Sequence, residues 1–132
     1  MTNLWNDNLG STTPDNLFYD TKHPVDVKAV KLKAGQGVLE RGTVLGIVTA
    51  DSLAVPVDSS KTDGSELADS ILTDTIDTGA AGATDNVVTT AYKTGSFNRQ
   101  ALKFGGSDTA DKHETRLRML GIFLKDDQAY DK

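Results

Sequence analysis

Alternating apolar and polar residues along the chain predict a domain built mainly of β-strands. The longest run of strand-forming residues covers residues 87–97, where Val, Thr, Tyr and Phe alternate between two faces. Gly95 interrupts the alternation, as a glycine does where a strand bends or bulges. Phe97 follows as a large apolar residue that we expect in the core. Shorter runs predict further strands over residues 25–34, 38–40, 43–50, 53–57, 70–76 and 122–124.

In the first of these shorter runs the apolar positions change face. Val25 and Val27 share one face of the expected strand, whereas Val30 and Leu32 share the other. Such a change of phase is typical of a β-bulge, which would lie near residues 28–29, or of a strand that is partly buried on both faces. Both interpretations place this strand in the body of the domain.

One segment has the 3.6-residue period of a helix, and the pattern predicts a helix over residues 109–120. Either Asp108 or Ser107 is a suitable residue to cap its N-terminus. Gly121 is suited to end it in the left-handed conformation. A second, shorter helical turn is expected within residues 98–104. The helix face that we expect to be buried carries His113, Leu117 and Leu120.

The sequence divides into an N-terminal arm, residues 1–24, and a β-rich domain, residues 25–132. The arm is rich in Asn, Asp and Thr and has no sustained helical or strand period. It nevertheless contains large apolar side chains, including the single tryptophan, which a free tail rarely needs. Residues 17–19 either pack on their own domain or contact a partner. The residues that we select as candidate partner contacts are Leu4, Trp5, Leu17, Phe18 and Tyr19.

Composition and charge narrow the classes of function. The 132 residues suit one domain, and the 37% hydrophobic and 6% aromatic content favours a thin core or one completed by oligomerisation. A formal net charge of −5 and a pI of about 4.8 argue against nucleic acid as a partner. The absence of cysteine excludes disulfides and thiolate metal sites. We expect no secretory signal and no membrane partner, because no suitable apolar run is present.

The sequence contains no convincing pattern of catalytic or ligand-binding residues. His113 and Glu114 begin like a zinc-protease motif, but Leu117 stands where the second histidine is required. The acidic stretches at residues 58–64 and 74–77 lack the alternating ligands of a calcium loop, so we interpret them as solvated turns. We therefore predict no enzyme, no cofactor and no metal site. The alternatives are a small β-barrel enzyme and a surface-binding module of unknown ligand.

Three segments, in this order, resemble the head decoration proteins of tailed phages of the lambda type. The first is Leu-Gly-Ile-Val-Thr at residues 45–49, on an early strand. The second is Ala-Tyr-Lys-Thr-Gly-Ser-Phe-Asn at residues 91–98, followed by Ala101 and Leu102. The third is Arg-Leu-Arg-Met-Leu-Gly-Ile-Phe-Leu at residues 116–124. The resemblance also includes the polar arm ahead of these segments, the acidic composition and the lack of cysteine.

This resemblance implies a mainly β fold, a small β-rich α+β domain with one or two short helices and an extended N-terminal arm. It also implies a homotrimer on the outside of an expanded capsid in the virion, at local three-fold positions. There the trimer would clamp the major capsid protein and stabilise the shell, with the arm reaching down to the capsid. The arm itself matches no motif of the family, and the polar loops at residues 58–66 and 78–86 are longer than in the lambda pattern. The arm contacts therefore follow by analogy of position.

Overall fold

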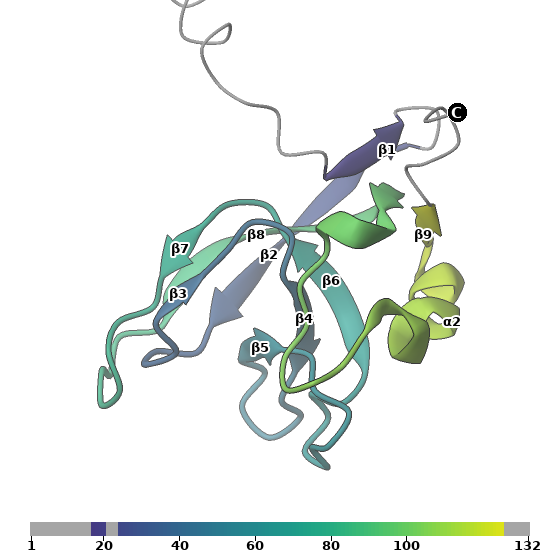
Figure 1. Ribbon diagram of the computed structural model, residues 1–132. Coiled ribbons are helices and arrows are strands. Elements are labelled where there is room, and N and C mark those ends of the chain that lie inside the picture. The colour runs from purple at the N-terminus through teal and green to yellow at the C-terminus, as the bar shows by residue number, and fades with distance from the viewer. Residues whose placement is uncertain (1–16, 21–23, 126–132) are drawn as a thin grey trace, which may run out of the picture.

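The strand predicted to be the longest is the central element of the fold. In the computed structural model, which describes residues 17–20 and 24–125, β8 (Val87–Asn98) pairs with four other strands. Its first part pairs with β2 and β6, and its last part lies between β1 and β9 (Figure 1). Gly95, with a φ of 145°, stands where the partners change. One long strand thus joins two layers of structure.

Five strands close into a barrel, which confirms the mainly β fold class. β2 (Asp26–Leu32) pairs antiparallel with β8 and parallel with β5 (Ala54–Pro56). β4 (Val44–Ile47) joins β5 to β6 (Ala68–Leu72), and β6 pairs with β8 to complete the ring. Closure satisfies the backbone groups that an open sheet would leave at its edges.

The barrel encloses the first of two apolar clusters. Because side chains alternate along a strand, every second residue of each barrel strand points inward. In β8, for example, Ala91 is buried while Thr90 is exposed. Removing these apolar side chains from water is the main favourable contribution to folding. The cluster consists of Val30, Leu32, Leu39, Leu45, Ala54, Leu72 and Ala91.

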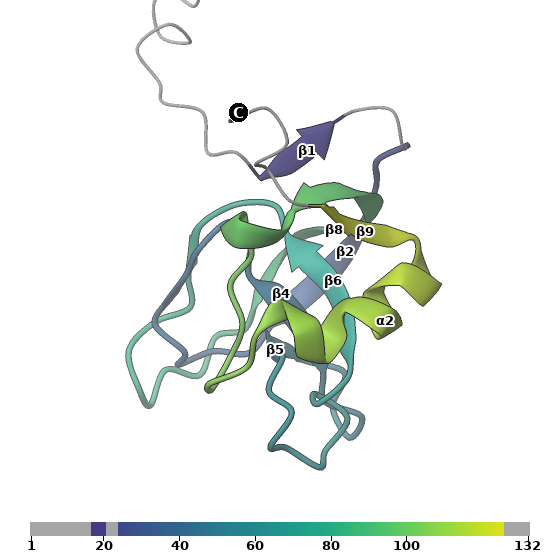
Figure 2. The same ribbon diagram turned by 45° about the vertical axis from the view of Figure 1, so that its right-hand side comes forward.

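A second apolar cluster lies outside the barrel wall. It is covered by β1 (Phe18–Asp20), the 3-10 turn η1 (Arg99–Ala101), α2 (Ala110–Leu120) and β9 (Ile122–Lys125). Figure 2 shows α2 lying across β6. As a result β4 and β6 are buried on both faces over most of their length, and β4 has a continuous apolar sequence. The cluster consists of Leu17, Val44, Val57, Ala68, Ile71, Phe97, Leu102, Leu117, Ile122 and Leu124.

Two of the predicted strands differ in detail from the structure. The strand expected over residues 70–76 is divided into β6 and β7 (Ile76–Asp77), because β7 leaves the barrel to pair with β3 (Val38–Leu39). The irregularity expected near residues 28–29 lies instead between Asp26 and Val27, where the pairing with β8 shifts register. That position is the end of the strand, and the register between Val27 and Leu32 is regular.

The predicted helix is confirmed, but its N-cap is not. Thr109 occupies the N-cap position without a side-chain hydrogen bond. The carboxylate of Asp108, one of the two predicted caps, binds Ser59 and His113 instead. Gly121 ends α2 with a φ of 98°, and its N–H donates to the carbonyls of Arg118 and Leu117. The helix buries two of the three residues predicted for its apolar face and leaves the third, Leu120, half-buried. Within the described part of the chain, no helix is both long and apolar enough to span a membrane.

Candidate functional site

The end of the predicted arm is part of the domain. β1 pairs antiparallel with β8, so that Phe18 lies opposite Phe97, and the N–H of Asn98 donates to the carbonyl of Leu17 over 2.8 Å. The side chain of Leu17 is 2% exposed and belongs to the outer apolar cluster. Of the two interpretations that the sequence left open for residues 17–19, the structure shows packing on their own domain.

A cluster of three aromatic rings and one guanidinium holds β1 in place. The ring of Phe18 lies 4.9 Å from that of Tyr92 in an edge-on arrangement and 5.0 Å from that of Phe97 in a stacked one. The guanidinium of Arg41 covers Phe18 at 5.8 Å and Tyr92 at 5.6 Å. Its Nη1 donates to the carbonyl of Thr73 over 2.7 Å and to the hydroxyl of Tyr92 over 2.8 Å. Cation–π and hydrogen-bonding contacts thus act on the same arginine.

β1 and β9 flank the same end of β8. Phe97 is the register partner of Phe18 on one side and of Leu124 on the other. The ammonium of Lys125 on β9 lies 5.4 Å from the ring of Tyr19 on β1, so the two outer strands also contact each other through side chains. Residue 17 and residue 125, where the described chain begins and ends, therefore lie at one end of the domain (Figure 1).

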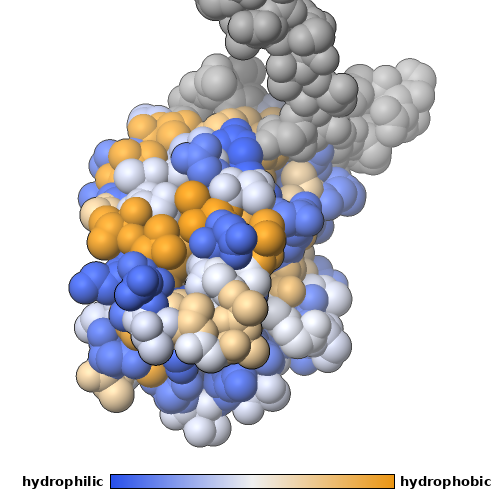
Figure 3. All heavy atoms as spheres, turned by 90° about the vertical axis from the view of Figure 1, so that its left-hand side faces the viewer, coloured by the Kyte–Doolittle hydropathy of each residue, from blue (hydrophilic) through white to orange (hydrophobic). Residues whose placement is uncertain are grey.

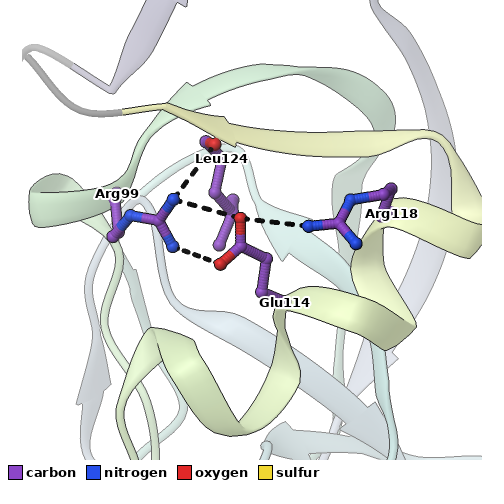
Figure 4. A network of polar contacts seen from close by, with 4 residues as sticks. All are labelled: Arg99, Glu114, Arg118 and Leu124. Atoms are coloured by element: carbon purple, nitrogen blue, oxygen red, sulfur yellow. Dashed lines mark hydrogen bonds and ion pairs between the residues drawn. The ribbon is translucent and has the colours of Figure 1, made fainter.

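A network of charged side chains secures the β9 side of this end. Glu114 on α2 accepts from both Nη atoms of Arg99, with the Nη2 bond measuring 3.0 Å, and lies 3.5 Å from Nη2 of Arg118 (Figure 4). Nη2 of Arg99 also reaches the carbonyl of Leu124 over 3.4 Å. Arg99 and Glu114 are about three-quarters buried, which shields their bidentate pair from solvent. The network ties η1, α2 and β9 together.

Two of the predicted site residues, Leu4 and Trp5, lie outside the described residues. Leu17 is in the core, whereas Phe18 and Tyr19 are half-buried at the surface of the same end. The structure therefore brings three of the five candidates together on β1, next to Arg41 and Lys125. Sequence reasoning missed both of these cations, since neither stands close in sequence to the aromatic residue that it contacts.

A hydrogen-bonded group elsewhere in the domain, in which the side chains of Asp108 and His113 are buried, was also not predicted. Oδ2 of Asp108 lies 2.7 Å from Nε2 of His113 and accepts from the N–H of Ser59 over 2.6 Å, while its Oδ1 accepts from the Ser59 hydroxyl over 2.7 Å. Burial raises the pKa of Asp108, but the hydrogen bonds from Ser59 and His113 outweigh it and lower the pKa below its ordinary value. No local spacing indicates this group, because Ser59 and Asp108 are 49 positions apart.

The Ser59–Asp108–His113 group differs from a catalytic triad. In a triad the histidine stands between the serine and the aspartate, where it removes the proton of the nucleophile. Here the aspartate stands in the middle, and the Ser59 hydroxyl donates to it rather than to the histidine. The ring of His113 is also stacked on Phe104 at 5.6 Å. This arrangement supports packing between a loop and a helix rather than nucleophilic catalysis.

The first acidic stretch, residues 58–64, forms turns that satisfy their own carboxylates, whereas the second, residues 74–77, is not all turn because it ends in the strand β7. Asp58 accepts from the N–H of Ser60 over 3.0 Å and from its hydroxyl over 2.7 Å, and these bonds lower the pKa of Asp58. Asp63 accepts in the same way from the hydroxyl of Ser65 over 2.6 Å and its N–H over 3.0 Å, which lowers the pKa of Asp63. In residues 17–20 and 24–125 no three His, Asp or Glu side chains are grouped to hold a metal ion.

Several apolar side chains are exposed on β2, β3 and β8. Val27 on β2 and Val88 on β8 point away from the barrel, and Val88 is 67% exposed. Val38 on β3 is also exposed. Figure 3 shows apolar side chains gathered across the middle of the face that carries β3 and β7. An exposed apolar surface of this kind is suited to contact with another protein.

Comparison with known proteins identifies the family. Residues 8–123 match the family described as bacteriophage lambda head decoration protein D. No curated protein matches the sequence. The family match includes part of the predicted arm, the closed barrel and the helix. Because it covers far more than half of the chain, the protein belongs to the lambda head decoration protein D family, a family of structural proteins of the phage capsid.

Proposed function

We propose that this protein binds the outer surface of an expanded phage head as a homotrimer, contacts the major capsid protein and stabilises the shell. Membership of the family establishes the decoration role and the location on the phage capsid. The finer proposal is carried by one observation: β1 and β9 flank the same end of β8, so both terminal segments start from one end of the domain. An end that bears two chain segments is suited to face the capsid.

The homotrimer is supported by the surface of the barrel. The core is divided into two modest clusters, and Val27, Val38 and Val88 remain exposed. Contacts between copies would cover such side chains and add to the buried apolar area. In a ring of three subunits each copy offers one surface to one neighbour and a different surface to the other neighbour. The exposed wall formed by β2 and β8 is a suitable candidate for one of these surfaces.

We assign the predicted arm residues two different parts in capsid binding. Leu4 and Trp5 contact the capsid directly, as apolar side chains in a polar segment. Leu17 and Phe18 contribute by holding the arm to the domain, since Leu17 is buried and Phe18 lies in the aromatic cluster. Tyr19 is half-buried and lies at the same end. An extended arm can also add a strand to a sheet of the partner, where backbone hydrogen bonds contribute much of the affinity.

Three arms on one trimer multiply a modest affinity. Once one arm is bound, the other two are held near their own sites at an effective concentration that short linkers raise into the millimolar range. Loss of all three arms is therefore expected to weaken binding much more than loss of one contact. A trimer that grips several capsid subunits at once also opposes their separation, which is how decoration would stiffen the shell.

The test is sedimentation with phage heads that lack the protein. We compare the full chain with a chain that lacks residues 1–16, which retains β1. By light scattering, the full chain should form a trimer of about three times 14.1 kDa, and the shorter chain should fold and form a correspondingly lighter trimer. Its binding to heads should fall by about 100-fold or more, because all three arms are lost. Wild-type occupancy by the shorter chain would refute the role of the arm, and a monomer at all concentrations and on heads would refute the trimer.

A further inference from the structure

We propose that Arg41 is a positioning residue for the arm: it clamps Phe18 to the barrel and so sets the direction in which the chain preceding Leu17 leaves the domain. This inference rests on the proposed role of the arm in capsid binding. It adds a residue from the segment between β3 and β4 to a site that otherwise consists of residues on β1, β8 and β9.

Hydrogen bonds hold both the backbone and the guanidinium of Arg41 in place. Its backbone N–H donates to the hydroxyl of Thr75 over 3.1 Å, and its Nη1 donates to the carbonyl of Thr73 and the hydroxyl of Tyr92. These bonds hold the planar guanidinium against the rings of Phe18 and Tyr92. A planar, permanently charged group can make ring contacts and directional hydrogen bonds at once, which a lysine ammonium cannot reproduce.

β1 requires such a clamp because its backbone pairing is limited. The strand has three residues, its only partner strand in the described part of the chain is β8, and its register shifts between Phe18 and Asp20. So short a strand is held mainly by its side chains. Leu17 enters the core just before the strand, and Phe18 is covered by Arg41 and Tyr92. Release of Phe18 would therefore loosen the whole attachment of the arm.

Firm attachment of Leu17 and Phe18 to the domain favours capsid binding through conformational entropy. An arm that already leaves the domain in the right direction loses less freedom when it binds than one attached to a loose strand. The benefit is repeated in each copy of a trimer. Arg41 thus acts on capsid binding without touching the capsid, through the position of Leu17 and Phe18.

The test replaces Arg41 by Met and follows two backbone amides by hydrogen exchange. The N–H of Asn98 donates to Leu17 on β1, whereas the N–H of Gly95 donates to Gly121 next to β9. In Arg41→Met we expect exchange at Asn98 to accelerate about tenfold, as for loss of a cation–π contact together with a charged hydrogen bond, with Gly95 unchanged. The concentration of protein that half-saturates empty heads should rise by at least about tenfold, since every arm of the trimer is affected.

Matched variants separate positioning from general destabilisation. Lys112→Met removes an exposed cation on α2 that belongs neither to the aromatic cluster nor to the Arg99–Glu114–Arg118 network, and it should change neither amide exchange at Asn98 nor head binding. Arg41→Lys keeps the charge but not the planar group, and should resemble Arg41→Met. If Arg41→Met does not fold, Tyr92→Phe removes only the hydroxyl that accepts from Arg41 and should give a smaller change in the same direction.

If the amide of Asn98 exchanges at the same rate in Arg41→Met as in the wild type, Arg41 does not clamp Phe18, whatever the result of the head-binding experiment. Faster exchange at Asn98 with unchanged head binding overturns the positioning role. Equal acceleration at Asn98 and Gly95 also overturns it, because the loss is then general. If the wild-type chain itself fails to bind heads, the proposed function fails, and that result is distinct from the exchange result at Asn98.

Discussion

Nε2 of His113 lies 2.7 Å from Oδ2 of Asp108, and both side chains are only 4% exposed. An ionised carboxylate can only accept hydrogen bonds, so the imidazole donates through Nε2–H. The same carboxylate accepts from the backbone and the hydroxyl of Ser59. One aspartate therefore joins α2 to the loop that follows β5, and its negative charge strengthens all of these bonds.

We expect Asp108→Asn to lower the free energy of unfolding by about 1.5–3 kcal/mol near neutral pH, the range for hydrogen bonds to a charged group. The folded-state pKa of Asp108 is lowered from its ordinary value of 3.8. The stabilisation from its charge is therefore complete above about pH 3.8 and is lost as the pH falls through the lower folded-state pKa. Urea unfolding of wild type and variant across this range should show their difference shrinking in acid.

The control for this prediction is Asp111→Asn, which changes an exposed carboxylate in the first turn of the same helix. It should alter the unfolding free energy by no more than about 0.5 kcal/mol. A difference between wild type and Asp108→Asn that stays constant from neutral to strongly acidic pH would show that the charge of Asp108 has no part in stability.

Phe97→Ala is expected to lower the free energy of unfolding by about 3–5 kcal/mol, as for other buried phenylalanines. Phe97 is fully buried and stacks on Phe18, and its strand lies between β1 and β9 at this position. Phe97→Leu should cost less, because it leaves a smaller cavity. Denaturant unfolding measures both variants, and a loss below about 1 kcal/mol for the alanine variant would be inconsistent with this packing.

Gly121→Val should destabilise the domain by more than about 1 kcal/mol, because a β-branched residue is strained at a φ of 98°. A Cβ atom at this position would also lie 3.2 Å from Cγ2 of Thr94. Gly121→Asn should cost less, since asparagine tolerates the left-handed conformation. Thermal unfolding ranks the two variants, and equal losses would mean that backbone conformation is not the cause.

Gly46→Ala tests a close approach between backbones. A Cβ atom on Gly46 would overlap the carbonyl group of Ser65, which belongs to the backbone and cannot rotate away. We expect a loss of about 1–3 kcal/mol, as for other overpacked sites. Gly37→Asn is the control, because a Cβ atom there meets no atom within 4 Å and asparagine suits its φ of 72°. A neutral effect of Gly46→Ala would contradict the packing of this loop on β4.

Trp5 provides a direct optical test of the arm. It is the single tryptophan of the chain, so its fluorescence is not mixed with that of another residue. If the arm binds the capsid through Trp5, its emission should shift to the blue when empty heads are added, and Trp5→Ala should weaken binding measurably. Met119→Ala, a change at an exposed position on α2, should leave binding unchanged. Unaltered emission on saturated heads would exclude Trp5 as an anchor.

The sequence by itself determined the elements whose causes are local. The alternation over residues 87–97 predicts β8, and the helical period together with Gly121 predicts α2 and its end. These signals act between residues a few positions apart, through side-chain alternation and backbone conformation. They also suffice for the mainly β fold class and, with the motif order, for the family.

Only the tertiary structure decided which strands are neighbours and which polar groups meet. Alternation shows which residues of a strand share a face, but it does not show which strands are neighbours, because every strand offers the same backbone hydrogen-bonding groups. The pairing of β2 with β5 and of β6 with β8 is therefore seen only in the structure. The same holds for Leu17, whose apolar side chain fits a partner or its own core equally well until β1 is placed on β8. Arg41 reaches Phe18, and Asp108 reaches Ser59, only because barrel closure brings distant segments together.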